Sequence, residues 1–289
     1  PQDFFVGYTI FIETTKQNHK TTVKSYCSES RKITWTEALP SSTRDKINYE
    51  IKSPEPSPLF AIRMTLGLKL EAKLKGISLK LATTRATNAL LEKKGPKVGL
   101  LVTKGFEDLI LIGNGSRPEL FSLQQPKFQS LATKVFSVDE RIMAEKHHSK
   151  PPNIGELDQA LDKILNNNIS NLAISFLNSH LNGQHERLAV KHAINKGFET
   201  VCCSSEISSQ AGYFNRISSV VTETFLNQPI KSYLESIAKY LDSEKFKVLT
   251  SAGTIVPWQN YRCIDALFSG PAGGAVALSM LATKGKQKL

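Results

Sequence analysis

Strand-like and helix-like segments alternate along this chain, and the alternation restricts its fold more than any other feature. Val98–Thr103 is an apolar run of strand length, and the helical pattern before it begins near Thr84 and ends at Gly95-Pro96. The second half repeats the alternation with a helix at Ile154–Asn166, a strand at Leu172–Leu177, a helix at Gln184–Asn195 and a strand at Phe198–Cys203. Such alternation is typical of a mostly parallel sheet flanked by helices, so the sequence predicts an α/β fold.

The N-terminal segment predicts a β-ribbon. Phe4–Ile12 is apolar and β-branched, and Thr21–Cys27 alternates between polar and apolar residues. Three prolines in Ser53–Pro58 end the ribbon, because proline lacks an N–H group and disfavours a helical conformation in the residue before it. We expect a helix at Leu59–Lys75 and a strand at Ile77–Thr83 to follow.

A basic segment that contains two adjacent prolines, Lys146–Pro152, predicts a linker in the middle of the chain. We therefore expect two domains, 1–150 and 151–289. Toward the C-terminus, Ile217–Leu241 predicts a long helix interrupted near Pro229, and Ala272–Ala282 predicts a final helix.

Charge and composition narrow the function classes. Lys plus Arg number 37 against 26 for Asp plus Glu, a formal net charge of +11, and the 40% of hydrophobic residues suits a globular protein. The basic residues are scattered and do not interleave with stacking aromatics, so no nucleic-acid binding is predicted. No apolar run reaches the roughly 20 residues that span a bilayer, and the first residues do not resemble a secretory signal. We therefore expect a cytoplasmic protein without membrane contact, whose four cysteines are reduced thiols.

Residue spacing alone identifies no active site. Gly270-Pro271-Ala272-Gly273-Gly274 opens a helix, and free N–H groups at a helix start can hold an anion. A tight strand-to-helix turn needs the same glycines. Gly270, Gly273 and Gly274 are therefore only weak candidates for an anion site.

Histidines and cysteines offer further candidates, each with a structural alternative. His180, His185, Glu186 and His192 could suggest a metal site, but they lack the i, i+4 spacing of a zincin pair, so we favour a polar helix face. For Cys202-Cys203 we favour packing over reactivity, because no cationic helix end is evident beside them.

Seven short motifs occur in the order found in one protein family. They are Thr83–Glu92, Gly99–Asp108, Arg117–Leu120, Val138–Arg141, Asn182–Glu186, Ser204–Ser208 and Ser269–Gly274. Together they resemble the hydantoinase/oxoprolinase A-type family over nearly the whole chain. The resemblance implies a truncated actin-like, sugar-kinase-like (ribonuclease-H-like) lobe with mixed sheets and flanking helices. It also implies a relationship to ATP-dependent oxoprolinases, hydantoinases and the acetone and acetophenone carboxylases.

The N-terminus departs from the family pattern. Family members usually open with Asp-x-Gly-Gly-Thr-x-Thr-Asp, whose glycines approach phosphate and whose carboxylates manage the metal ion. This chain has Phe5-Val6-Gly7-Tyr8-Thr9-Ile10-Phe11-Ile12 there, so Phe5, Gly7, Tyr8, Thr9 and Ile12 occupy vestigial phosphate-loop positions. The usual His-Gly-Thr-Thr is likewise altered to Leu81-Ala82-Thr83-Thr84. We therefore predict no catalytic residue, cofactor or metal in this chain.

These departures predict a structural role within a larger enzyme. The chain is similar to the shortened A-type homologue in acetophenone carboxylase, and it stops soon after Gly274, where relatives continue into a second nucleotide-binding lobe. The resemblance implies a non-catalytic subunit of an ATP-dependent ketone carboxylase that forms a β-keto acid from ketone and bicarbonate. Its partners would be a full-length A-type subunit, which holds ATP and Mg²⁺, and a B-type subunit.

Two other functions stay open. The chain could be the ATP-binding half of an oxoprolinase- or hydantoinase-type amidohydrolase, or a free-standing basic binding module. For any assembly we expect the long loop Gly113–Thr133 to dock on a partner through its spaced apolar side chains, Phe121, Leu123, Phe128 and Leu131.

Overall fold

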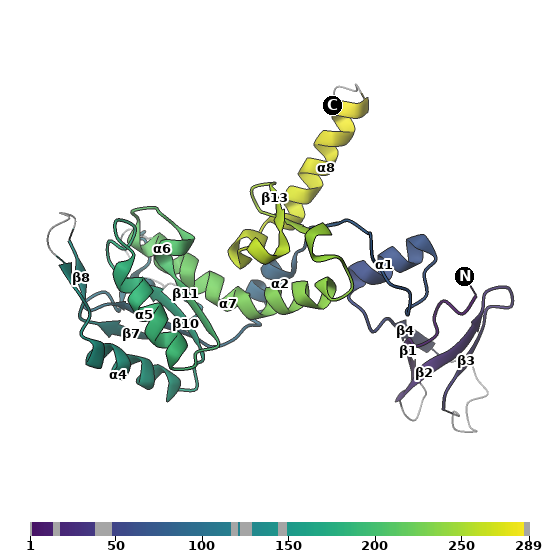
Figure 1. Cartoon of the computed structure of the whole chain (residues 1–289), viewed down its shortest axis with the longest axis horizontal. Coiled ribbons are helices and arrows are strands. Elements are labelled where there is room, and N and C mark those ends of the chain that lie inside the picture. Colours follow the sequence, from purple (N-terminus) through teal and green to yellow (C-terminus); the bar gives the residue numbers. More distant parts are fainter. Residues whose placement is uncertain are drawn as a thin grey trace. The chain divides into compact units, whose positions relative to one another are not determined.

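The computed structural model describes residues 2–13, 18–37, 48–116, 121, 129–143 and 149–285. The chain divides into two compact units, residues 1–81 with 232–247 and residues 82–231 with 248–289 (Figure 1). These units do not follow the chain order of the two predicted domains, 1–150 and 151–289, because a late segment belongs with the N-terminal unit. Within the described residues no helix has the length and apolar character needed to cross a membrane.

The N-terminal unit is built on an antiparallel sheet with the strand order β3-β2-β1-β4. Its strands are β1 (Thr9–Glu13), β2 (Asn18–Cys27), β3 (Lys32–Trp35) and β4 (Asn48–Lys52). Ile10 lies opposite Thr21 on one side and Ile51 on the other. The predicted ribbon is therefore present, but its first strand begins at Thr9 rather than Phe4. The residues before it form turns, with Gly7 at a φ of +84°.

The first helix, α1, is shorter than predicted. It spans Ser57–Leu66 and ends at Gly67, which takes the left-handed conformation at φ 65°. Arg63 explains why the chain does not continue as a helix to Lys75. Its buried guanidinium pairs with Glu55 at 2.6 Å and donates hydrogen bonds to two backbone carbonyls beyond the helix, those of Lys69 and Ala72. These bonds fix residues 69–72 in a non-helical path, after which β5 (Leu79–Leu81) follows.

The larger unit contains the predicted parallel sheet, with the strand order β11-β10-β6-β7 (Figure 1). Its strands are β6 (Val98–Thr103), β7 (Ala132–Val138), β10 (Asn171–Ser175) and β11 (Thr200–Cys203). All three pairings are parallel. The chain therefore has the predicted α/β fold, with an antiparallel sheet in one unit and a parallel sheet in the other.

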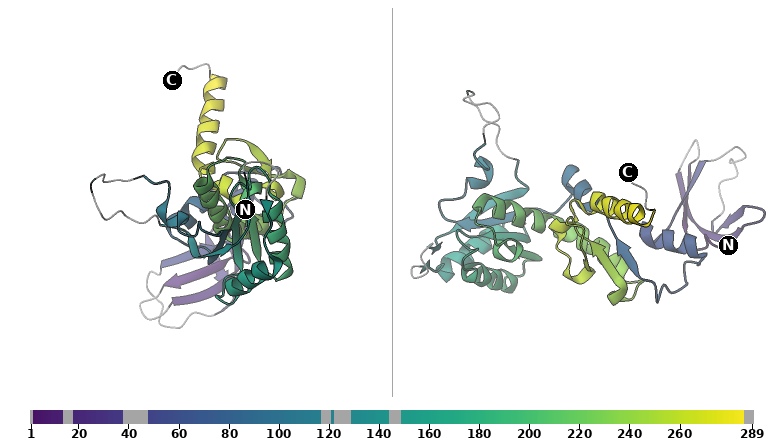
Figure 2. Two further views of the ribbon diagram at one scale, coloured as in Figure 1. Left: turned by 90° about the vertical axis from the view of Figure 1, so that its left-hand side faces the viewer. Right: turned by 90° about the horizontal axis from the view of Figure 1, so that it is seen from above.

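Helices of this unit cover the sheet and supply its core (Figure 2). The helices that contact the sheet are α4 (Ile154–Leu165), α5 (Gln184–Asn195) and α6 (Ser204–Ile207). Two shorter helices are α2 (Arg85–Leu91), which contacts the 3₁₀ turn at Cys263–Ala266, and α3 (Leu109–Ile112). Leu157 and Leu161 from α4 and Ala189 from α5 are buried in one cluster with Ile174 of β10. Asn153 caps α4 by accepting a hydrogen bond from the Glu156 N–H.

The C-terminal part contains two long helices, α7 (Tyr213–Ala238) and α8 (Ser269–Gly285), the latter drawn in yellow in Figure 2. The prediction of an interruption near Pro229 is wrong, because α7 is continuous with that proline inside it. The remaining strands are β8 (Arg141–Ile142), β9 (Ser149–Lys150), β12 (Phe246–Leu249) and β13 (Ile255–Pro257), and single 3₁₀ turns lie at Ser243–Lys245, Trp258–Asn260 and Cys263–Ala266. The C-terminal end of the predicted linker is thus part of a β-pair, since β9 pairs with β8.

Candidate functional site

Polar side chains from separate motifs meet at the carboxyl edge of the parallel sheet. The four strands end at Thr103, Val138, Ser175 and Cys203, and parallel strands present their carboxyl ends at one common edge. The motif residues Glu140, His185, Glu186 and Ser204 follow these strand ends in the sequence, and all four are buried. Motifs that lie up to a hundred residues apart in the chain thus form one polar cluster.

Glu140 is the first centre of this cluster. One carboxylate oxygen accepts a hydrogen bond from the Thr103 hydroxyl, and the other lies 2.6 Å from Nδ1 of His185. The Thr103 oxygen in turn accepts a hydrogen bond of 2.8 Å from the N–H of Leu177. Burial raises the pKa of Glu140, although its bonds to Thr103 and His185 act in the opposite direction. This group therefore links the loops that follow β6, β7 and β10.

Glu186 is the second centre, and it is fully enclosed. One of its oxygens accepts hydrogen bonds from the Phe176 N–H at 2.8 Å and the Ser204 hydroxyl at 2.7 Å. The other accepts a bond of 2.8 Å from the Ser205 N–H. Three donors around one carboxylate replace its lost hydration. Glu186 therefore holds the loop after β10 against the start of α6.

The favoured prediction for the histidine segment, a polar helix face, is wrong for His185 and Glu186, because both side chains are buried. The helical pattern did not reveal this, since their partners come from other strands. His192 instead pairs with Asp158 at 3.0 Å, and His180 lies beside Arg216. Within the described part of the chain, no group of three His, Cys, Asp or Glu side chains could hold a metal ion.

The glycine-rich motif lies in the first turns of α8 and packs against the Ala82–Thr84 segment. A Cβ atom on Gly270 would lie 2.7 Å from the Thr84 methyl group, and one on Gly273 would lie 3.0 Å from the Ala82 Cβ. The Ser269 hydroxyl fixes this contact by donating a hydrogen bond of 3.0 Å to the Thr83 carbonyl. Gly270 and Gly273 thus allow close packing, whereas a Cβ on Gly274 would meet nothing within 4 Å. Their candidacy for an anion site stays a prediction.

The positions predicted to be a vestigial phosphate loop, Phe5–Ile12, lie in the N-terminal unit. Tyr8 is fully buried, and the Phe5 and Phe60 rings lie 5.8 and 5.9 Å from its own ring. Burial raises the pKa of Tyr8. Ile12 is also buried, Thr9 is partly exposed, and a Cβ on Gly7 would lie 3.0 Å from a methyl group of Leu70. Tyr8 and Ile12 therefore belong to an aromatic and aliphatic core, against which Phe5 packs.

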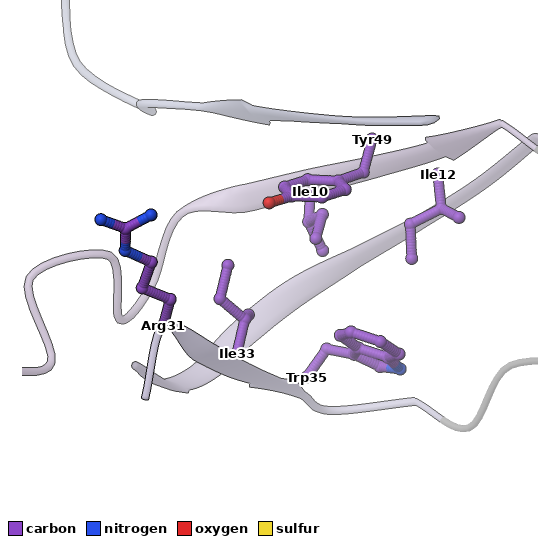
Figure 3. A pocket seen from close by; sticks show the side chains of 6 residues that line it. All are labelled: Ile10, Ile12, Arg31, Ile33, Trp35 and Tyr49. Atoms are coloured by element: carbon purple, nitrogen blue, oxygen red, sulfur yellow. The ribbon is translucent and has the colours of Figure 1, made fainter. Parts of the chain in front are cut away.

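A groove of about 280 Å³ lies on one face of the same antiparallel sheet. Figure 3 shows Ile10, Ile12, Ile33, Trp35 and Tyr49 around this space, with Arg31 at one end. The groove has an apolar floor and one cationic end, and the sequence patterns gave no sign of it.

The remaining predicted positions carry little chemistry. Burial raises the pKa of the Cys202 thiol to about 11 and that of Cys203 to about 12, which suits the predicted packing role. In the predicted docking loop, Phe121 is 99% exposed and Leu131 is partly buried. Leu123 and Phe128 lie outside the described residues.

Family models match most of the chain. The hydantoinase/oxoprolinase N-terminal region matches residues 41–197, and the hydantoinase/oxoprolinase domain matches residues 216–289. The N-terminal match begins after Phe5–Ile12, so the comparison of those positions with a phosphate loop depends on the sequence motif alone.

Individual relatives and solved structures agree with these matches. The chain is 32% identical to the 5-oxoprolinase PfmaA of Pestalotiopsis fici, over 85% of this chain and 23% of that protein. It is 30% identical to the 5-oxoprolinase of Saccharomyces cerevisiae, over 81% of this chain and 21% of that protein. The chain thus spans about a fifth of the length of these relatives.

The structure is similar to nucleotide-free acetone carboxylase, with a TM-score of 0.68 and 19% identity over 82% of this chain and 37% of that one. It is also similar to the ATP-dependent caprolactamase of Pseudomonas jessenii, with a TM-score of 0.67 and 22% identity over 98% of this chain and 40% of that chain. At these identities the likeness establishes the fold.

Proposed function

Since the chain belongs to the hydantoinase/oxoprolinase family, we propose that it is a non-catalytic part of an ATP-dependent enzyme of that family. The observation that carries this proposal is the packing of Tyr8. A phosphate group needs a backbone that it can approach closely, and here a buried tyrosine ring fills the corresponding place. The neighbouring positions Phe5 and Ile12 are apolar, so they supply no carboxylate for Mg²⁺.

The polar cluster at the sheet edge supports the same conclusion. Both oxygens of Glu140 and both oxygens of Glu186 already have partners within the chain. Carboxylates that are engaged in this way fix the loops rather than act as free acids or bases. We therefore assign the cluster a structural role.

Exposed apolar surface supports a role within an assembly. On α8, Leu278, Met280 and Leu281 are each at least 60% exposed. Apolar side chains grouped on one helix favour burial against another protein surface.

For the assembled enzyme, the first candidate is an acetophenone-type ketone carboxylase that forms a β-keto acid from ketone and bicarbonate. In this proposal a full-length A-type subunit binds ATP and Mg²⁺, and a B-type subunit completes the complex. The similarity in fold to acetone carboxylase supports this candidate.

The second candidate is an oxoprolinase- or hydantoinase-type ATP-dependent amidohydrolase, to which this chain would contribute one half. Two observations favour it. The chain is 30–32% identical to 5-oxoprolinases but 19% identical to the acetone carboxylase chain, and it is 29% identical to a caprolactamase subunit alpha.

Co-purification followed by activity measurement tests the proposal. The tagged chain is purified from its source, and the proteins bound to it are identified by mass spectrometry. ATP hydrolysis by that complex is then measured with acetophenone and bicarbonate or with 5-oxoproline. We expect stimulation by one of these substrates and no ATP hydrolysis by the isolated chain.

Calorimetry of the isolated chain with ATP and Mg²⁺ supplies the decisive control. Micromolar binding would contradict a non-catalytic role and would favour the ATP-binding half of an amidohydrolase. Absence of any A-type or B-type relative among the captured proteins would instead contradict the assembly.

A further inference from the structure

The groove on the antiparallel sheet has an apolar lining that comes from three of its strands. These residues are Ile10 and Ile12 of β1, Ile33 and Trp35 of β3, and Tyr49 of β4 (Figure 3). In a flat sheet the edge strands β3 and β4 would lie about 14 Å apart, because neighbouring strands are about 4.8 Å apart. The pairing of β2 with β3 shifts between Val23 and Ser25, and such an irregularity bends a strand and increases its twist. The face is therefore concave, so that side chains of both edge strands enclose one space.

The walls of the groove are accessible, whereas its floor is buried. Ile10 and Ile12 belong to the core of the unit. Ile33 and Trp35 are partly exposed, and Tyr49 is 60% exposed. An apolar cavity of about 150 Å³ accommodates benzene, so a groove of about 280 Å³ has room for one aromatic ring with a short side arm. Its size thus fits a small molecule.

Arg31 gives the groove its polar end (Figure 3). This residue is exposed, and none of the ion pairs among the described residues includes it. No acidic side chain is among the described residues that line the groove. Arg31 also takes the left-handed conformation, at a φ of 51°, which glycine or asparagine adopts at a lower cost. The turn itself therefore gives no reason for an arginine here, and its charge is free to pair with an anion.

We propose that this groove binds a small carboxylate with an apolar, ring-sized body. The body packs between Tyr49 of one edge strand and Ile33 and Trp35 of the other. The carboxylate pairs with the Arg31 guanidinium, whose fork of N–H donors matches two carboxylate oxygens. A single arginine balances the one charge of a carboxylate, whereas a phosphate dianion would keep a charge unpaired. Ligand sites commonly combine apolar walls with a few polar groups that orient the ligand.

This site goes beyond the proposed function and does not depend on it, since a chain that lacks catalytic groups can still bind a ligand. NMR titration of the full chain tests the groove with defined probes. The chain has two tryptophans, Trp35 and Trp258, and the spectrum of Trp35→Phe assigns the indole N–H signal of Trp35. The ligands are 3-phenylpropanoate and its neutral amide, 3-phenylpropanamide, at constant ionic strength. We expect both to shift the Trp35 signal in a saturable manner, and the carboxylate to bind about fivefold more tightly because of its ion pair with Arg31.

Three variants link the binding to the named residues. Arg31→Gln removes the charge, so the carboxylate and the amide should then bind with equal Kd. Lys32→Gln is the matched control, because it removes the same charge from a residue on the opposite face of β3 from Ile33, and it should preserve the fivefold preference. Ile33→Phe places a larger side chain in the groove and should weaken binding of both ligands at least fivefold, with its fold checked by circular dichroism.

Any of four results would overturn the site. Equal affinities of the native chain for the carboxylate and the amide would show that the charge is not recognised. Loss of the preference in both Arg31→Gln and Lys32→Gln would show a general effect of net charge. An unchanged Trp35 signal at every ligand concentration would show that the groove does not bind this class of molecule. A dimer that Ile33→Phe disperses in analytical ultracentrifugation would assign the groove to a second copy of the chain. None of these results would affect the co-purification test of the proposed function.

Discussion

At the residue scale, the buried carboxylates explain how the loops after the parallel strands are held. Glu140 and Glu186 each accept hydrogen bonds from groups on other elements, and His185 contacts Glu140 from the start of α5. A buried charge is tolerated when several donors surround it, and removal of the charge leaves those donors unpaired. Substitutions at these positions should therefore change stability more than surface substitutions do.

Glu186→Ala should be strongly destabilising. The change leaves the N–H groups of Phe176 and Ser205 without their acceptor and opens a cavity, so we expect a loss of about 3 kcal/mol in the free energy of unfolding. Urea denaturation followed by circular dichroism measures this loss. Glu199→Ala, at an exposed position, serves as the control and should change stability by less than about 0.5 kcal/mol. Equal stability of the two variants would show that the Glu186 bonds contribute little.

Glu140 should give the chain a defined dependence of stability on pH. Burial raises its pKa, so the folded state binds a proton more tightly than the unfolded state does. The stabilisation is complete below the ordinary glutamate pKa of about 4.3 and is lost as the pH rises through the raised pKa of the folded state.

Glu140→Gln keeps a neutral side chain at every pH and isolates this effect. We expect the stability of the native chain relative to Glu140→Gln to fall in urea titrations as the pH rises above the ordinary glutamate pKa of about 4.3. His185 and Arg141 face Glu140 in both proteins, so their own contributions are largely shared. A relative stability that rises with pH would contradict the raised pKa.

At the element scale, the start of α8 combines helix formation with close packing. Glycine inside a helix usually weakens it by about 0.5–1 kcal/mol relative to alanine. Gly270 and Gly273 have a compensating reason to be glycine, because their Cα atoms approach Thr84 and Ala82. Gly274 has no such neighbour within 4 Å.

Two alanine substitutions on α8 should therefore have opposite effects. Gly274→Ala should raise the free energy of unfolding by about 0.5–1 kcal/mol through the higher helix propensity of alanine. Gly270→Ala should lower it, since its Cβ atom would lie 2.7 Å from the Thr84 methyl group. Differential scanning calorimetry of the two variants checks this contrast, and similar gains from both would show that Thr84 moves aside without cost.

At the scale of the whole molecule, the exposed apolar side chains indicate where a partner can bind. Phe121 is almost completely exposed, so its ring contributes nothing to packing within the chain. An aromatic side chain in that state often becomes an anchor of a protein interface.

Phe121→Ala should weaken assembly by roughly 2 kcal/mol without changing the stability of the chain, and we expect the combined variant with Phe128→Ala to weaken it further. The measurement is the pull-down yield of the full-length A-type subunit that we propose as the partner. Leu91→Ala, which alters an exposed residue on α2, is the matched control. An unchanged yield with a folded Phe121→Ala chain would place the interface elsewhere.

Several local elements and the protein family can be predicted from the amino-acid sequence. Val98–Thr103 and Gln184–Asn195 have the predicted bounds, because apolar runs and helical periodicity act over short distances. Seven ordered motifs were enough to indicate the hydantoinase/oxoprolinase family, whose models match 41–197 and 216–289.

The contacts between these elements could not be predicted from the sequence and are seen in the folded structure. The sequence predicts a polar helix face at His185 and Glu186, but residues from other strands and loops bury both side chains. The helix α1 ends early because Arg63 binds carbonyl groups beyond it, and the Ser269 hydroxyl binds a carbonyl 186 residues away in the chain. Contacts of this kind have no local signature, since burial and hydrogen bonding depend on segments that meet only after the chain has folded.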